Sequence, residues 1–172
     1  MCVINLAHSR EIEAAILAIL MMQSEKVSEA IRIVEPEDFY CSGNRIILRS
    51  IYEAHDQGRP TDLVLTCHYL DTKGLLQECG GAAYLASLLD GFPKSETKNL
   101  IHYCFELRRL RLLRDIQKKC YRIATNRTLD ESLNEVFILG IKIDEFLRFI
   151  ENKKASSEGQ NESAKLVKAA NG

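Results

Sequence analysis

The sequence predicts an all-α protein, with a compact head of about six short helices followed by a long antiparallel helical hairpin. Three observations lead to this prediction. Apolar residues recur at spacings of three and four, which is the period of one face of a helix. Segments that alternate apolar and polar residues are nearly absent, as are hairpin turns between them. Glycine and proline recur at short intervals in the first part of the chain and limit its helices to short lengths. A long later stretch contains neither residue.

The head is expected to span residues 1–95 and to begin with a helix that Ser9 caps. One face of this helix carries an apolar stripe, and a short helix over 26–34 is expected to follow it. The stripe consists of Ile12, Ile16, Ile19 and Leu20.

The stretch EPEDFY (35–40) places three carboxylates beside two aromatic residues. Pro36 suits a first helical turn, because its missing N–H would be unpaired there, and acidic residues favour the same turn through the helix dipole. We therefore expect a short turn that Phe39 and Tyr40 anchor to the core. A catalytic carboxylate pair is the less favoured interpretation, since no neighbouring group would push two pKa values apart.

Glycine and proline set the limits of the remaining head helices. A helix over 41–58 can begin at Ser42 or Asn44, carries the stripe Ile47, Ile51 and Ala54, and can end at Gly58 in a left-handed conformation. Pro60 prevents continuation. Thr61 or Asp62 can cap the next helix, which runs to about Lys73 and closes at Gly74. After Gly80-Gly81, the stretch 82–89 predicts a further buried helix.

The hairpin is expected to span 96–152. Its first helix runs from about Glu96 to Asn126, and a break at 126–130 precedes the second helix, which Thr128 or Asp130 can cap. The first stripe consists of Leu100, Tyr103, Leu107, Leu110, Leu113, Ile116, Cys120 and Ile123. The second consists of Leu133, Val136, Leu139, Ile143, Phe146 and Ile150. The polar stretch 153–172 is expected to be a linker or tail.

The two ends of the chain differ in charge. Residues 1–100 contain 9 Lys and Arg against 14 Asp and Glu, whereas residues 101–172 contain 14 against 10. Within the hairpin the first helix is basic and the second is acidic, so that the hairpin attracts an antiparallel copy of itself. Further apolar residues, Phe137, Ile138, Ile141, Leu147 and Phe149, exceed what one hairpin buries. Burial against another subunit or another protein is therefore expected.

Motifs for catalysis or cofactor binding are not found. The sequence lacks a GxxxxGK[ST] phosphate loop, an HExxH motif and a GxSxG motif. Cys67 and His68 are neighbours, but adjacent residues on a helix do not face each other. The six cysteines form no CxxC pair and are expected to be small apolar fillers. We expect no catalytic residue, no metal and no cofactor in this chain.

The expected compartment is the cytoplasm, without membrane association. The apolar run 14–22 invites interpretation as a signal peptide. However, Glu11 and Glu13 precede it where basic residues belong, and the run is too short to span a bilayer.

The order of these segments resembles the N-terminal domain of bacterial replicative DNA helicases of the DnaB type, from about His8 to Glu151. The resemblance rests on several stretches in order. They are SREIEAAILAIL (9–20), EPEDFY (35–40), NRIILRSIYEAHDQGRPTDLVLTCHYL (44–70), KGLLQECGGAAYLASLL (73–89) and HYCFELRRLRLLRDI (102–116). The resemblance implies a helical head and hairpin, homo-oligomeric association as a dimer or ring, and contact with primase and a helicase loader. In that family ATP and Mg belong to a C-terminal domain, and we expect this chain to lack that domain.

The expected interface lies on the hairpin, where ordinary hairpin core is the alternative for each position. Its residues are Leu107, Leu110, Arg114, Ile116, Cys120, Ile123, Val136 and Ile141. The arginine and lysine run of the first hairpin helix could contact DNA phosphates, but a solvated or salt-bridged face is favoured, because aromatic residues do not interleave the run. DNA binding is therefore expected to be weak or indirect.

The favoured function is a non-catalytic collar domain that mediates subunit association and primase or loader interaction in DNA replication. Alternatives are a free-standing regulator that binds or blocks a helicase ring, and a nucleic-acid-binding helical protein. An unrecognised enzyme is the least favoured.

Overall fold

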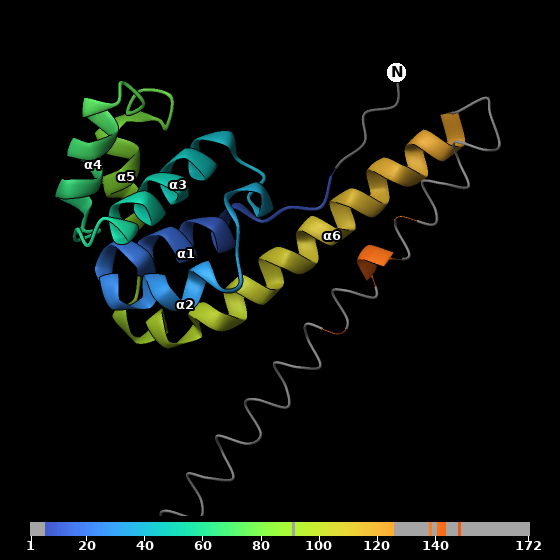
Figure 1. The fold of residues 1–172 in the computed structure, drawn as a ribbon, viewed down its shortest axis with the longest axis horizontal. Helices are drawn as coiled ribbons and strands as arrows, with labels where there is room; N and C mark the ends of the chain where they lie inside the picture. Colours follow the sequence, from blue (N-terminus) through green and yellow to red (C-terminus); the bar gives the residue numbers. More distant parts are fainter. Residues whose placement is uncertain (1–5, 91, 126–137, 139–140, 144–147, 149–172) are drawn as a thin grey trace, which may run out of the picture. The chain divides into compact units, whose positions relative to one another are not determined.

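The computed structural model describes residues 6–90, 92–125, 138, 141–143 and 148 (Figure 1). The described part is all-α, as predicted, and contains no strand. Six α-helices and three short 3₁₀ helices (η) occur in these residues. In chain order they are α1 (Arg10–Met22), η1 (Ser24–Lys26), α2 (Val27–Ile31), η2 (Pro36–Asp38), α3 (Ser42–Asp56), α4 (Leu63–Thr72), α5 (Gly81–Leu89), η3 (Lys94–Asn99) and α6 (Leu100–Thr125).

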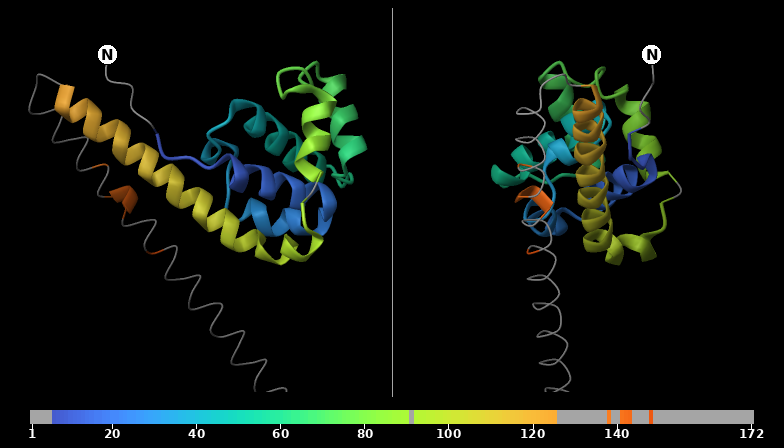
Figure 2. Two further views of the ribbon diagram at one scale, coloured as in Figure 1. Left: turned by 180° about the vertical axis from the view of Figure 1, so that it is seen from behind. Right: turned by 90° about the vertical axis from the view of Figure 1, so that its right-hand side faces the viewer.

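The chain forms two compact units, Met1–Arg114 and Asp115–Gly172. Helix α1 is the centre of the first unit and packs against α3, α4 and α5. Every residue from Ala15 to Met21 is buried, as expected for a helix that is apolar on all sides. The part of α6 that belongs to this unit lies alongside α1 and α2 (Figure 2) and contributes the buried side chains of Leu100, Cys104 and Leu107.

Several predicted helix ends are confirmed. The Ser9 hydroxyl accepts a hydrogen bond from the Ile12 amide at 3.3 Å. Of the two candidate caps for α4, it is Asp62 that accepts, from the Val64 and Leu65 amides. Gly58 follows α3 with a φ of 67°, which is the left-handed conformation expected there.

Other predicted elements are corrected by the structure. The expected helix over 26–34 is α-helical only to Ile31. The expected long helix begins at Leu100 rather than Glu96, because residues 94–99 form the 3₁₀ helix η3. The prediction of a buried helix over 82–89 was wrong for one face. Leu85 and Leu88 are buried, whereas the small residues Ala82, Ala83, Ala86 and Ser87 are exposed.

The second arm of the hairpin and the expected tail lie mostly outside the described residues. The described residues of the second unit include an ion pair between Asp115 on α6 and Lys142, with Oδ2 and Nζ 3.6 Å apart. The domain limits 96–152 and 153–172 stay predictions. Within the described residues, no helix is long and apolar enough to cross a membrane.

Candidate functional site

A buried carboxylate connects three helices of the first unit. Glu13 on α1 is 1% exposed. Its Oε1 accepts from the Tyr40 amide at 2.5 Å, and its Oε2 accepts from the Cys41 amide at 3.3 Å and from Asn44 Nδ2 at 2.9 Å. The Tyr84 hydroxyl on α5 donates to Asn44 Oδ1 at 2.7 Å. Glu13 therefore holds the main chain where it enters α3, just before the first helical turn, and Cys41 itself supplies no side-chain cap.

This role of Glu13 was not predicted from the sequence. The sequence does contain an indication of this role, because Glu13 is a charged residue on an apolar helical face. It shares that face with Ile16, Leu17 and Leu20 at spacings of three, four and seven. A charged residue on an apolar face has to be paired or hydrogen-bonded when the face is buried.

Within the EPEDFY stretch, Pro36–Asp38 form the 3₁₀ helix η2, and the acids of the stretch have structural partners. The Glu35 amide donates to Asp38 Oδ2 at 2.8 Å, and Glu37 forms an ion pair with Arg49 at 2.9 Å. Asp38 is buried, and burial raises the pKa of its carboxyl group above the ordinary value.

Only one of the two aromatic residues anchors this turn to the core. Phe39 is fully buried, as expected. Tyr40 is 39% exposed, so the expectation that it is a core anchor was wrong. Instead its ring stacks on His8, with centroids 4.4 Å apart and an interplanar angle of 19°. Tyr40 thereby covers the segment that enters α1 rather than filling the interior.

Three arginines on α6 donate to main-chain carbonyls of residues 33–38, and we call this set the arginine clamp. Arg108 donates to Ile33 O at 2.9 Å, Arg111 donates to Glu37 O, and Arg114 donates to Asp38 O. Arg114 is 2% exposed and also donates to Ala7 O at 3.0 Å. Burial lowers the pKa of its guanidinium group, but an arginine stays charged at neutral pH.

The clamp explains why α6 is basic on its inner side. The carbonyls that follow α2 and surround η2 lack N–H donors from a regular helix or sheet. A buried carbonyl without a hydrogen bond destabilises the folded state. A guanidinium group can satisfy two carbonyls at once, as Arg114 does for Asp38 O of this segment and Ala7 O before α1. From α3, Arg45 does the same for Phe39 O at 2.6 Å and Tyr40 O at 3.3 Å. Much of the basic run is therefore used within the fold.

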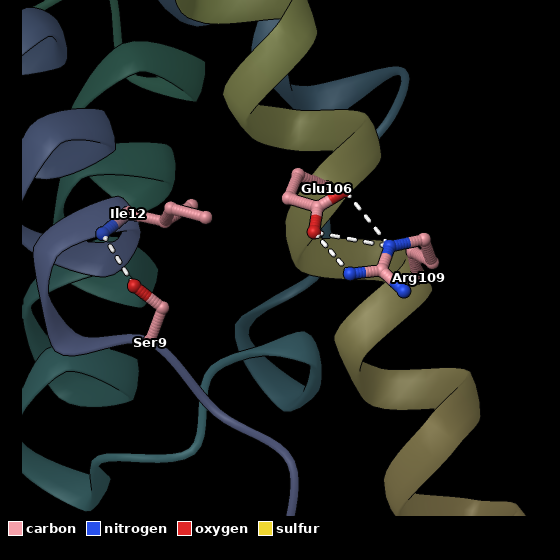
Figure 3. A network of polar contacts seen from close by, with 4 residues as sticks. All are labelled: Ser9, Ile12, Glu106 and Arg109. Atoms are coloured by element: carbon pink, nitrogen blue, oxygen red, sulfur yellow. Dashed lines mark hydrogen bonds and ion pairs between the residues drawn. The ribbon is translucent and has the colours of Figure 1, made fainter.

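Arg109 on the same helix behaves differently. It forms an ion pair with Glu106 one turn earlier, through both carboxylate oxygens (Figure 3). Its side chain is 52% exposed. The predicted salt-bridged face is confirmed at this pair.

The predicted interface residues fall into three groups. Leu107, Leu110 and Arg114 are buried in the first unit by residues of the same chain, and so do not present a surface there. Ile116 is partly buried, Cys120 is exposed and Ile141 is 46% exposed. The side chain of Ile123 and all of Val136 lie outside the described residues. The role of the set in partner binding stays a prediction.

Among the described residues of the second unit, the large apolar side chains of Tyr121, Ile138 and Ile141 are exposed, at 45%, 41% and 46%. Exposed large apolar side chains are candidates for burial in a protein interface. In the part of the chain that the structure describes, no group of three metal-ligating side chains occurs. Burial raises the pKa of the Cys104 thiol to about 12 and that of Cys79 to about 11, which makes both unreactive near neutral pH.

Comparison with known proteins gives consistent matches. The family model described as the DnaB-like helicase N-terminal domain matches residues 5–109. The replicative DNA helicase DnaB of Pasteurella multocida (strain Pm70) is 28% identical over 145 residues, which cover 78% of this chain and 31% of that protein. DnaB of Geobacillus stearothermophilus is 28% identical over 153 residues, which cover 89% of this chain and 33% of that protein. The chain thus spans about a third of the length of these relatives.

The fold has a counterpart among solved structures. The crystal structure of the N-terminal domain of DnaB helicase from Mycobacterium tuberculosis matches with a TM-score of 0.71 and 22% sequence identity. The match covers 77% of this chain and 99% of that structure.

Proposed function

Because the chain belongs to the DnaB-like helicase N-terminal domain family, we propose that it acts as a non-catalytic collar domain of a replicative helicase. In this proposal it joins helicase subunits to one another and offers primase or a helicase loader a surface. ATP hydrolysis is assigned to a different part of the assembly.

The observation that carries the proposed self-association is the exposure of Tyr121, Ile138 and Ile141 in the second unit. Burying an apolar side chain of this size on association is favourable by about 1.5–3 kcal/mol when it is complete. Ile141 is the best position for a test, because its side chain is exposed and a charge there leaves the buried core of the first unit intact.

The arginine clamp is an argument against strong DNA binding and supports the expectation that DNA contact is weak or indirect. Arg108, Arg111 and Arg114 donate to carbonyls of their own chain, so that binding phosphates through them would open the turn that they hold. Binding through many phosphate contacts would make affinity fall steeply with salt. We expect no such steep dependence for this chain.

The proposal is tested by solution mass, measured by light scattering over a concentration series with wild type and Ile141→Glu. The matched control is Val64→Glu on α4, because Val64 is apolar and 73% exposed but belongs to the first unit. We expect a mass well above 19.5 kDa for wild type and Val64→Glu, and a lower mass for Ile141→Glu. Helical circular dichroism should be the same in all three. A wild type that is monomeric at every concentration, or an Ile141→Glu variant with unchanged mass, contradicts the proposal.

A further inference from the structure

A groove of about 750 Å³ lies on the first unit, between the N-terminal turns of α1 and α3 and the helix α5. Its volume falls within the range of about 300–1,000 Å³ that is usual for ligand pockets. Leu88, Phe92 and Pro93 give it an apolar wall. All residues that line the groove belong to the first unit, and none of them belongs to the arginine clamp.

The charged residues that line the groove are Glu11, Glu78, Asp90 and Arg10. Arg10 and Glu11 are neighbours on α1 and offset each other in net charge. Hydrogen bonds from the main chain and from the Ser9 hydroxyl lower the pKa of Glu11, so that it is ionised at neutral pH. Two further carboxylates, Glu78 and Asp90, remain. The groove therefore carries an excess of negative charge.

Three helix N-termini border the groove. Glu11 is an acid in the first turn of α1, and the Glu13 carboxylate accepts two amides where the chain enters α3. Gly80, the N-cap residue of α5, also lines the groove and has no side-chain cap. A helix N-terminus carries only about half a unit of positive charge, which is less than the two negative charges of Glu78 and Asp90, so the sign of the groove is not reversed.

The position of Asp90 at the C-terminal end of α5 is the strongest indication of a cationic ligand. It is the C-cap residue of α5, and the last turn of α5 contains no basic residue. The C-terminal end of a helix carries a partial negative charge, and basic side chains usually occupy that position. Neither Asp90 nor Glu78 makes a side-chain hydrogen bond or an ion pair with another described residue. A cation from outside would offset the charge that α5 leaves uncompensated.

We propose that this groove binds a short basic and apolar segment of a partner protein. A lysine or arginine of the segment pairs with Asp90, and a second pairs with Glu78. Apolar side chains between them contact Leu88, Phe92 and Pro93. The proposal goes beyond subunit association and does not depend on it, since the groove lies within the first unit.

The test uses the full chain and two labelled pentapeptides, one alternating lysine with leucine and the other alternating glutamate with leucine. Binding is measured by fluorescence anisotropy at about 50 and 200 mM salt. We expect the lysine peptide to bind, with weaker binding at the higher salt, and the glutamate peptide not to bind. Equal or tighter binding of the glutamate peptide would identify an anion site and overturn the proposal, as would no binding of either peptide.

Variants place the binding in the groove. Asp90→Asn and Glu78→Gln remove one charge each and should weaken the lysine peptide about three- to fivefold apiece. Ser87→Arg adds a positive charge at an exposed groove position and should weaken it further. Glu25→Gln is the matched control, because Glu25 is exposed beyond the opposite end of α1, about 20 Å away along the helix.

Circular dichroism establishes that each variant is folded. Equal losses in Glu25→Gln and Asp90→Asn would mean non-specific attraction and overturn the proposal. A change of solution mass in the groove variants would assign the groove to a second copy of the chain, which overturns it as well.

Discussion

Replacing Glu13 by glutamine keeps the shape of the side chain and removes one hydrogen-bond acceptor from a buried site. Glu13 Oε1 accepts from Tyr40 N, and Oε2 accepts from Cys41 N and Asn44 Nδ2. A glutamine offers one oxygen and one NH₂ group. Whichever way it turns, its NH₂ group faces at least one N–H donor that it cannot satisfy.

The magnitude follows from these contacts. A buried donor that is left unsatisfied costs about 1–3 kcal/mol. The better orientation of glutamine gives up the Tyr40 amide and keeps the other two donors. Those two bonds then lose their charge assistance, which makes each roughly half as strong. We expect the free energy of unfolding to fall by about 3 kcal/mol, a large fraction of the total of about 5–15 kcal/mol for a typical protein.

The assay is urea unfolding followed by helical circular dichroism. Glu25→Gln is the control, since an exposed substitution of the same chemistry should stay within about 0.5 kcal/mol of wild type. Tyr84→Phe removes the outer member of the network and should cost about 1 kcal/mol. A Glu13→Gln variant as stable as the Glu25→Gln control would refute the reasoning from the buried network.

Two further predictions concern the turn at 35–40. Burial raises the pKa of Asp38, so the folded state binds this proton more tightly than the unfolded chain, and wild-type stability falls as pH rises through that window. Asp38→Asn does not titrate there, and it should therefore gain stability relative to wild type as pH rises above about 4 in urea unfolding; a constant difference would contradict this. Arg114→Met should lower the free energy of unfolding by about 2 kcal/mol, because two carbonyls lose a charged donor, and should speed hydrogen exchange in the segment 35–41. Arg109→Met removes only an exposed ion pair and should cost less than about 1 kcal/mol, so equal effects of the two arginine variants would argue against the clamp.

Features that depend on neighbouring residues were predictable from the sequence. The caps at Ser9 and Asp62 and the left-handed glycine after α3 follow from side chains within a few residues of the helix ends. The α-helical class follows from the apolar period, which the buried stripe of Ile47, Ile51 and Ala54 on α3 confirms.

Features that depend on distant residues were not predictable in the same way. Arg114 was predicted to be an interface residue, but its acceptors are backbone carbonyls of Ala7 and Asp38, which carry no sequence signal. Tyr40 was expected in the core because aromatic residues are often buried, whereas its neighbour Phe39 fills that place. The exposed face of α5 looked apolar because alanine counts as apolar, although alanine has little surface to bury.

The arginine clamp also determines when the head can complete its folding during synthesis on the ribosome. Arg111 follows its acceptor Glu37 by 74 residues, and Arg114 follows Ala7 by 107. At a synthesis rate of about 5–20 residues per second, the early segments wait about 4–20 s for these arginines to be translated. During that interval the carbonyls around η2 are hydrated, and α1 lacks the side that α6 covers. When a ribosome pauses before Arg108, the nascent head therefore still exposes apolar surface. A chaperone that binds exposed apolar segments would bind most strongly at this stage.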